Sequence, residues 1–221
     1  IDLDEVEIKE NTKTTKVSTI NPINIQTIST SELQKAACCN ISESFTTNNT
    51  IDVSYSDGVS GIKKIQMLGL DGKYIQITSE AIPLIKGMQR TYGLSHIPGS
   101  WIESIQIIKG AGSVLNGHES FTGQINLEYF KPESADRLFW NIYSHSEGKL
   151  ENNLMLAKKK GNWRSNLFTH FSYFNKEVDH NHGGYHDHQT HQDIGGKDGF
   201  LDSPKMKQFG FINRWRYYGN E

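Results

Sequence analysis

One segment constrains the fold of this chain more than any other: the stretch from Ile102 to Leu127, IESIQIIKGAGSVLNGHESFTGQINL. It begins with isoleucines set among polar residues, is interrupted by four glycines, and ends with a short apolar run around Ile125. This order predicts a strand, a glycine-rich turn, a short helical turn and a second strand. Because glycine permits close backbone approaches that other residues resist, we expect the segment to pack tightly against a large body.

The glycines of this segment do not form a phosphate-binding loop. A dinucleotide fingerprint requires GxGxxG, but Leu115 stands where the third glycine is needed. A Walker loop ends in Gly-Lys-Ser/Thr, whereas this chain has Gly117-His118-Glu119. The glycine cluster therefore indicates packing and not nucleotide binding.

Composition excludes several classes of protein. The chain has 23 basic and 25 acidic residues, so its charge is nearly balanced and we expect no nucleic-acid partner. No run approaches the roughly 18 apolar residues of a spanning helix, whereas barrel strands alternate apolar and polar residues and remain compatible with this sequence. No nucleophile, base and orienting group occur together, so we do not expect an enzyme.

The N-terminal residues 1–28 have the composition of an extended, poorly anchored arm, with a charged start followed by a Thr-rich run. The alternative is an arm that pairs with another protein as an added strand. The chain begins at Ile1 without methionine or a signal sequence. We therefore expect a mature, trimmed or partial product.

Residues 29–130 have the pattern of a compact domain with helices and strands. Capping-box spacings at Ser29–Glu32 and Asn40–Glu43 predict short helices near 31–39 and 41–47. Asp71-Gly72 is a turn dipeptide, so we expect a hairpin between the strands on either side of it. The predicted strands are Ile51–Tyr55, Ile62–Leu68, Lys73–Thr78 and Ile102–Lys109.

The cysteines and two isolated histidines of this region carry no predicted site. Cys38 and Cys39 are adjacent, and Cα atoms about 3.8 Å apart lie below the usual disulfide window of about 4.4–6.8 Å. We interpret them as small, partly buried residues at a helix end, with a redox or soft-metal pair as the alternative. His96 and His118 stand alone near glycines, as hydrogen-bonded structural histidines do.

Residues 131–221 have the pattern of a β-meander. The predicted strands are Leu138–His145, Asn153–Lys159, Trp163–Phe174 and Phe209–Tyr218. Short and long connections alternate, and aromatic residues lie near strand ends, which is typical of outer-membrane barrels. About four strands cannot close a barrel, and an open two-faced sheet aggregates. We therefore expect the sequence to continue past Glu221.

The two faces of these strands differ in polarity. In the third strand one face carries Trp163, Leu167, Phe171 and Tyr173, and the other carries Arg164, Asn166, His170 and Ser172, with Phe168 and Phe174 as exceptions. In the fourth strand Phe209, Phe211, Trp215 and Tyr217 lie opposite Arg214 and Arg216.

The segment Ile102–Leu127 resembles the C-terminal motif of the plug domain of TonB-dependent outer-membrane receptors. That motif runs I-E-x-I-E-V-I-K-G-P, then a helical turn ending in Y-G, then G-x-I-N-I. This chain has Ile102-Glu103, Ile107-Ile108-Lys109-Gly110, Gly117 and Gly123-Gln124-Ile125-Asn126-Leu127. It departs from this motif at Ala111 and Asn116, where the family usually has proline and tyrosine, and the chain departs from the family at Leu68, where an arginine is common. The variant with Cys38-Cys39-Asn40 is similar to receptors of the Bacteroidetes lineage.

The resemblance implies a fold and a transport function. The implied fold is an α+β plug domain at 29–130, followed at 131–221 by the first antiparallel strands of a transmembrane β-barrel, about four of a total of about 22. Such receptors lie in the outer membrane of Gram-negative bacteria among its lipids and need no cofactor. They bind a scarce extracellular ligand and import it when the inner-membrane TonB complex pulls on an N-terminal segment, near which residues 1–28 would lie. A surface lipoprotein is a further partner compatible with this family.

The loop at 176–204 is unusually rich in histidine. If the first barrel strand runs outward, this loop is extracellular. Imidazole binds zinc, copper and nickel, and carboxylates complete such shells, so the loop predicts a transition-metal site for one of these ions or for an iron chelate. The alternative is a solvated polar loop. The candidate ligands are His180, His182, His186, His188, His191, Asp179, Asp187 and Asp193. Asp198-Gly199-Phe200 with Asp202 is also similar to a calcium-binding turn, although the full loop pattern is absent.

Three functional hypotheses follow. The first is an energised receptor that imports a metal ion or metal chelate. The second keeps the receptor but changes the ligand to a corrinoid, saccharide or peptide. The third is a surface metal-binding or adhesion module without transport.

Overall fold

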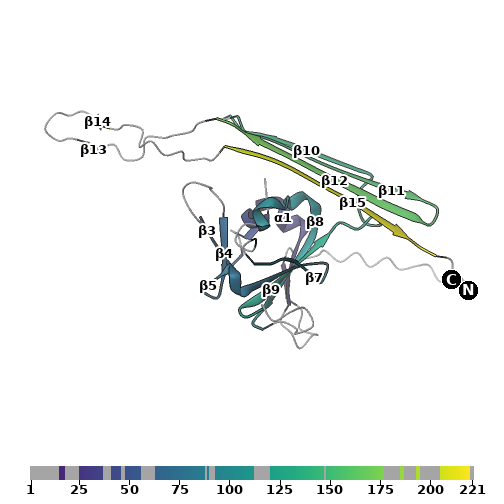
Figure 1. The fold of residues 1–221 in the computed structure, drawn as a ribbon, viewed down its shortest axis with the longest axis horizontal. Coiled ribbons are helices and arrows are strands. Elements are labelled where there is room, and N and C mark those ends of the chain that lie inside the picture. Colours follow the sequence, from purple (N-terminus) through teal and green to yellow (C-terminus); the bar gives the residue numbers. More distant parts are fainter. Residues whose placement is uncertain are drawn as a thin grey trace, which may run out of the picture.

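The computed structural model describes residues 15–17, 25–36, 41–45, 48–55, 63–87, 89, 93–111, 120–146, 148–176, 185–186, 193–194 and 205–219. These residues form two bodies, an N-terminal domain that ends with Tyr129 and a long antiparallel sheet that lies across it (Figure 1). Among the described helices, none is long and apolar enough to cross a membrane.

The N-terminal domain is built on a six-stranded sheet in the order β1-β2-β8-β9-β6-β7. The predicted strand pair is confirmed, because β8 (Ile102–Lys109) and β9 (Gly123–Tyr129) are antiparallel neighbours in its centre. β9 also pairs in parallel with β6 (Ile75–Ser79), which pairs with the edge strand β7 (Ile82–Ile85). The alternating isoleucines of β8 face the domain core, where Ile102, Ile105 and Ile107 are fully buried.

Two helices and a small sheet complete the N-terminal domain. Helix α1 (Thr30–Ala36) is tied to β8, because the Thr30 hydroxyl donates to the Glu103 carbonyl over 2.6 Å. The helix α2 (Ile41–Ser44) adds the fully buried Ile41 to the same core, next to Phe45. The small sheet consists of β3 (Ile51–Tyr55), β4 (Lys63–Met67) and β5 (Leu70–Asp71), and 3-10 turns lie at η2 (Gly72–Tyr74), η3 (Gly93–His96) and η4 (Gly99–Trp101).

The predicted hairpin at Asp71-Gly72 is wrong. The reversal lies three residues earlier, at Leu68 and Gly69, which both have positive φ (54° and 76°), as a two-residue hairpin turn of type I′ requires. Strand β4 therefore pairs with β5, whereas β6 belongs to the large sheet. Asp71 caps η2 instead, because its carboxylate accepts from the Lys73 backbone N–H at 3.1 Å.

The predicted boundary between the arm and the domain also needs correction. Residues 25–28, expected in the arm, belong to β2 (Ile25–Ser29), which pairs antiparallel with β8. The apolar Ile28 is the reason, because it reaches the core and is fully buried. Strand β1 (Thr15–Val17) adds to the outer edge of β2. The remainder of residues 1–28, the helical turn expected within 112–119, and the cysteines at 38 and 39 lie outside the described residues.

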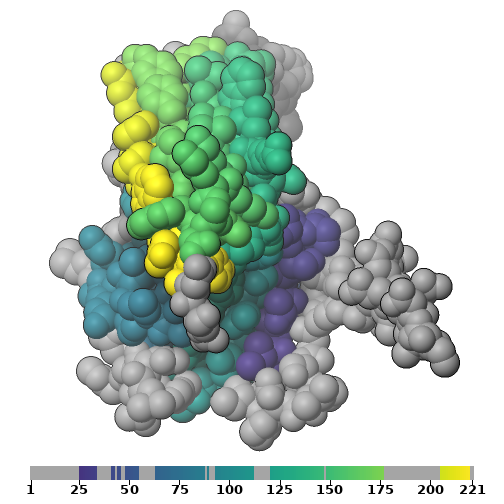
Figure 2. Space-filling model, turned by 90° about the vertical axis from the view of Figure 1, so that its right-hand side faces the viewer, coloured from purple at the N-terminus to yellow at the C-terminus, as the bar shows by residue number. Residues whose placement is uncertain are grey.

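The long sheet contains β10 (Leu138–Ser144), β11 (Leu150–Lys160), β12 (Trp163–Phe174) and β15 (Met206–Tyr217), paired in that order. This confirms the four predicted strands. Figure 2 shows them side by side above the N-terminal domain, from yellow β15 across to teal β10. The two-stranded piece β13 (Tyr185–His186) and β14 (Asp193–Ile194) belongs to the connection between β12 and β15.

The long sheet has an inverted polarity. Its inner face buries Glu151, Asn153, Asn166, His170 and Ser172 against the N-terminal domain, while aromatic side chains of the outer face are exposed, Trp215 by 64% and Phe209 by 73%. The exceptions in the predicted pattern of β12, Phe168 and Phe174, are buried on the inner face as well. Water-soluble sheets bury apolar faces, so this arrangement is that of a sheet whose outer face meets an apolar medium.

Gly123 provides a test of the packing. A Cβ atom at this position would overlap the Met67 sulfur and lie 2.5 Å from the Ile108 carbonyl oxygen. We predict that Gly123→Ala lowers the free energy of unfolding by about 1–3 kcal/mol, as overpacking does, measured by denaturant unfolding of the full-length protein in detergent.

The control for this substitution is Gly219→Ala. A Cβ atom at this position would lie 3.9 Å from the nearest atom, on Tyr217. The substitution should therefore leave the free energy of unfolding unchanged. Equal unfolding midpoints for the two variants would contradict the packing at Gly123.

Candidate functional site: the interface between the domain and the long sheet

The centre of the interface is an aromatic cluster around Trp101. The turn η4 places this residue directly before β8, and its ring lies 5.7 Å from the Phe168 ring and 6.4 Å from the His170 ring, edge to face with the latter. Tyr129 contacts the same phenyl group from β9, at 6.2 Å. On β15, Gly210 leaves room for the indole, because a Cβ atom there would lie 3.1 Å from it. The cluster joins both strands of the central pair to the long sheet.

Polar groups surround this aromatic centre. His170 Nδ1 hydrogen-bonds Asn153 Oδ1 at 2.7 Å, and Lys149 forms an ion pair of 2.8 Å with the buried Glu151. The Asn166 amide donates to the Phe130 carbonyl over 2.8 Å. Most polar groups of the inner face are therefore buried with hydrogen-bonding partners, as buried polar groups require, whereas Glu151 Oε2 and Asn166 Oδ1 are buried without one among the described residues.

An ionic cluster joins the two bodies at the β6–β7 turn. Arg214 of β15 donates two hydrogen bonds from Nη2 to the carboxylate of Glu80, at 2.7 and 2.9 Å. Lys131 contacts the same carboxylate at 2.8 Å and also that of Glu128 at 2.8 Å. Charge-assisted bonds of this kind are stronger than neutral ones. One carboxylate of the domain is thus held by two cations.

The backbone that presents Glu80 is strained. Glu80 and Ala81 have φ of 50° and 63°, values that non-glycine residues rarely adopt. Two hydrogen bonds hold the turn, because the Glu80 N–H donates to the Leu127 carbonyl at 2.9 Å and the Ala81 N–H to Asn126 Oδ1 at 2.8 Å. Strained residues persist where surrounding contacts determine them, commonly at functional positions.

The charges around Glu80 alter two ionisations. Burial acts to raise the pKa of Glu80, but the hydrogen bond from Lys131 and the charge of Arg214 outweigh it and hold the pKa below its ordinary value of 4.5. Burial and the nearby Glu80 charge raise the pKa of Tyr129. Glu80 is therefore a carboxylate at neutral pH, as the ion pairs require.

The linker between β9 and β10 is fixed to the C-terminal end of β15, next to Arg214. Glu133 accepts a hydrogen bond of 2.7 Å from the Tyr218 hydroxyl and lies 3.3 Å from Arg216. The carbonyl of the same residue accepts from Lys159 at 2.7 Å. Nearer the other end, Gln208 donates to the His96 carbonyl at 2.8 Å. Contacts to the domain and its linker are spread along the strand.

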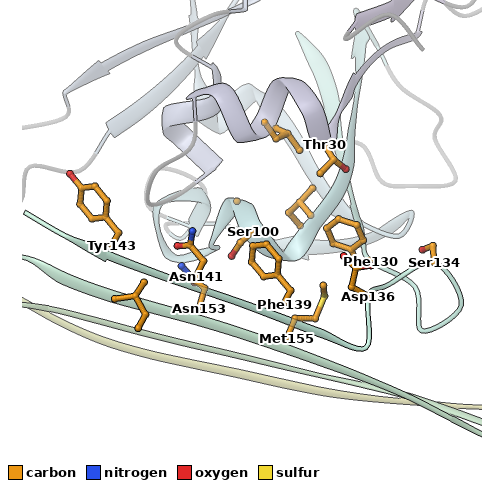
Figure 3. A pocket seen from close by; sticks show the side chains of 14 residues that line it. Thr30, Ser100, Phe130, Ser134, Asp136, Phe139, Asn141, Tyr143, Asn153 and Met155 are labelled. Carbon is orange, nitrogen blue, oxygen red and sulfur yellow. The ribbon is translucent and has the colours of Figure 1, made fainter. Parts of the chain in front are cut away.

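A cavity of about 440 Å³ lies between the domain and the long sheet. Figure 3 shows it between the helical elements of the domain and the strands β10 and β11. Its lining mixes aromatic and aliphatic groups, such as Phe130, Phe139 and Met155, with the polar Ser100, Asn141 and Asn153. The cavity can accommodate a small polar molecule beside an apolar wall.

Comparisons with known proteins agree with this geometry. Residues 19–124 match the family described as TonB-dependent receptor plug domain. The N-terminal domain is a TonB-dependent receptor plug domain. We call it the plug from here on. The matched family is one of receptors and not of enzymes. A search of curated proteins gave no match.

Solved structures of such receptors share the fold of this chain. The FrpB iron transporter from Neisseria meningitidis matches with a TM-score of 0.63 and 15% identity, over 89% of this chain and 30% of that one. The copper transporter OprC matches at 0.57 and 16% identity, over 76% and 26%. The ferric yersiniabactin uptake receptor FyuA from Yersinia pestis matches at 0.58 and 14% identity, over 74% and 26%. The chain thus spans less than a third of the length of these receptors, and the predicted fold class is confirmed: a plug followed by antiparallel strands like those that begin the receptor barrel.

The predicted metal residues lie mostly outside the described part of the chain. Of the eight candidates, only His186 and Asp193 fall within it, in β13 and β14, where the register makes them directly opposite partners. His180, His182, His188, His191, Asp179 and Asp187 lie in undescribed stretches, as does the calcium-like turn at 198–202. Within the described residues no group of three or more His, Cys, Asp or Glu side chains is arranged to hold a metal.

Sequence reasoning missed the residues that join the plug to the long sheet. Glu80 follows a predicted strand without any motif, and Trp101 precedes the predicted strand Ile102–Lys109 without a pattern that marks it. The one usable signal was the placement of Arg214 and Arg216 on the polar face of a strand, since a buried cation requires a carboxylate partner. The isolated His96 is exposed and contributes its carbonyl, not its ring, to the interface.

The ion pair between Glu80 and Arg214 gives a second prediction. In a double-mutant cycle of Glu80→Gln and Arg214→Gln, the coupling free energy should be about 0.5–3 kcal/mol, measured by denaturant unfolding of the full-length protein at neutral pH. Because the folded pKa of Glu80 is depressed, its contribution is fully present above the ordinary pKa of 4.5 and is lost as pH falls through the lower folded value.

Asp52→Asn serves as the matched control, since Asp52 is exposed on β3. Paired with Arg214→Gln it should show no coupling. Zero coupling between Glu80 and Arg214 would mean that this contact does not hold the plug.

Proposed function

We propose that this chain is the plug and the first barrel strands of an outer-membrane receptor of a Gram-negative bacterium, which imports a scarce ligand with energy from TonB. The observation that supports this proposal is the packing of a plug domain against a sheet with a polar inner face and an exposed aromatic outer face. A plug held by polar and ionic contacts suits this role, because such contacts can be exchanged for water when the plug moves. A purely apolar interface would resist separation.

For the ligand, we propose a transition-metal ion or a metal chelate. Five histidines occur within the loop at 176–204, and the register of β13 and β14 brings His186 opposite Asp193. Residues opposite one another in an antiparallel pair are close neighbours, and this register supports the proposal that His186 and Asp193 bind the same ion. This loop joins two strands of the long sheet at the end away from the Lys160–Trp163 turn, and in the proposed topology it is extracellular.

The solved structures with this fold include receptors named for iron, copper and ferric yersiniabactin. Those names describe other proteins, and at these identities the likeness concerns the fold. Receptors of the same fold that carry a corrinoid, saccharide or peptide remain the alternative, with the cavity of mixed polarity beside β10 as a feature that suits an organic ligand. A surface metal-binding module without transport is the second alternative, and it does not account for a plug domain.

The proposal predicts a specific loss in a histidine variant. Replacing His180, His182, His186, His188 and His191 with alanine should lower the binding of Cu²⁺ and Zn²⁺ to the full-length receptor at least about tenfold, since each lost ligand weakens the site. In the unchanged protein, binding should fall as pH drops below about 6.5, where free histidine takes up a proton. Calorimetric titration with each metal salt measures both effects.

A matched control replaces Asn181, Gln189 and Gln192 with alanine in the same loop and should bind metal normally. Equal metal affinity of the two variants would contradict the proposal that the ligand is a metal, but it would not contradict the proposal that the protein is a receptor. Uptake of radioactive metal into cells with and without TonB then separates transport from surface binding, because a module without transport gives the same accumulation in both.

A further inference from the structure

A basic groove lies at the end of the long sheet where β11 turns into β12. It has a volume of about 830 Å³ and is lined by Lys158, Lys160, Trp163, Ser165, Trp215 and the turn at 161–162. In Figure 2 this end of the sheet faces the viewer. None of these residues takes part in the contacts that join the plug to the long sheet described above.

The strand register places the lysines and tryptophans on one face. Lys160 is opposite Trp163, Lys158 is opposite Ser165, and Ser165 is opposite Trp215. Opposite residues in a sheet project from the same face, and the two tryptophans are 52% and 64% exposed. All four side chains therefore belong to the outer face of the sheet, away from the plug.

The aromatic rings form an ordered floor for this groove. The Trp163 ring lies 6.3 Å from the Trp215 ring, at 81° to it, and 5.0 Å from the Tyr217 ring. Farther along the same face, Leu156 and Phe211 are exposed. The groove thus opens onto an apolar surface, so a molecule that fills it needs an apolar part.

The charge of this end of the sheet is strongly positive. Its described cations are Arg137, Lys158, Lys159, Lys160, Arg164 and Arg216, against the acids Glu133 and Asp136. Glu133 is already engaged by Arg216 and Tyr218. Within the described part of the chain, Lys158 and Lys160 have no carboxylate partner, and both are exposed. The groove therefore offers two uncompensated ammonium groups beside a tryptophan floor.

We propose that this groove binds an anionic phospholipid, with the headgroup phosphate between Lys158 and Lys160 and the acyl chains along Trp163 and Trp215. The proposal rests on the proposed function only in that the outer face of the long sheet must lie in a membrane. Tryptophan prefers the level of the headgroups, and lysines near an anionic membrane surface each contribute attraction. Free phosphate would use the lysines alone and leave the aromatic floor uncovered, which favours a lipid as the occupant.

The test uses the full-length receptor in nanodiscs that contain phosphatidylcholine with a small fraction of phosphatidylglycerol. Lipid retained by the receptor after transfer to detergent is measured by native mass spectrometry. We expect Lys158→Gln/Lys160→Gln to retain phosphatidylglycerol about tenfold less than the unchanged protein, because two attractive charges are lost. Lys158→Arg/Lys160→Arg keeps the charges and should restore retention.

The matched control is Lys205→Gln/Lys207→Gln, which removes two charges at the opposite end of the sheet. It should retain phosphatidylglycerol normally. Equal retention by the two glutamine variants overturns the site, and so does displacement of the lipid by inorganic phosphate, which would show a site for a free anion. A receptor that inserts into nanodiscs without this selectivity contradicts only the lipid site, whereas failure to insert contradicts the proposed function itself.

Discussion

The structure depends on one constraint: the polar inner face of the long sheet can be buried only against a body that satisfies most of its hydrogen bonds. A carboxylate, amides and an imidazole are expensive to bury without partners. The plug and the linker that follows it meet this need with backbone and side-chain groups, of which the Phe130 carbonyl is the clearest, because it accepts from both Asn166 and Arg214, at 2.8 and 3.4 Å. Other polar groups pair within the sheet, as His170 does with Asn153, and only Glu151 Oε2 and Asn166 Oδ1 of this face are buried without a partner among the described residues.

The same constraint sets how the plug and the sheet can separate. Apolar packing between them centres on Trp101 and Phe168 and extends to Met155 and Phe139, while the ends of the interface rely on ion pairs and single hydrogen bonds. Water can replace the polar contacts at modest net cost, since each exchanges one hydrogen bond for another. The strained turn at Glu80 and Ala81 depends on contacts to β9 and to Arg214. Loss of Arg214 would therefore loosen both the ion pair and the turn that presents it.

Sequence reasoning predicted the features that follow from periodicity. The strands β3, β8 and β12 have the expected bounds, and the outer aromatic face of β15 is confirmed. It failed where two signals competed. Asp71-Gly72 outweighed Leu68-Gly69 as a turn, because leucine rarely adopts the positive φ that it has here. Phe168 broke the polar alternation of β12 for a reason visible only in three dimensions, namely its contact with Trp101 and Tyr129. The role of Glu80 in the interface could not be predicted, because an ion pair between residues far apart in the sequence leaves no local sequence pattern.

The segment Ile102–Leu127 therefore matters in a way that its glycines alone do not reveal. Strands β8 and β9 are antiparallel, so the residue before the first strand and the residue after the second lie together, and the Phe130 N–H donates to the Trp101 carbonyl at 3.1 Å. The Trp101 indole lies in the aromatic centre of the interface, and the Phe130 carbonyl accepts a hydrogen bond from Asn166 on the inner face of the sheet. Gly123 allows close packing in the middle of the plug, but it is the paired ends of the two strands that dock the plug. A change in the register of this pair would move both docking residues at once, because a one-residue slip turns every side chain of a strand to the other face.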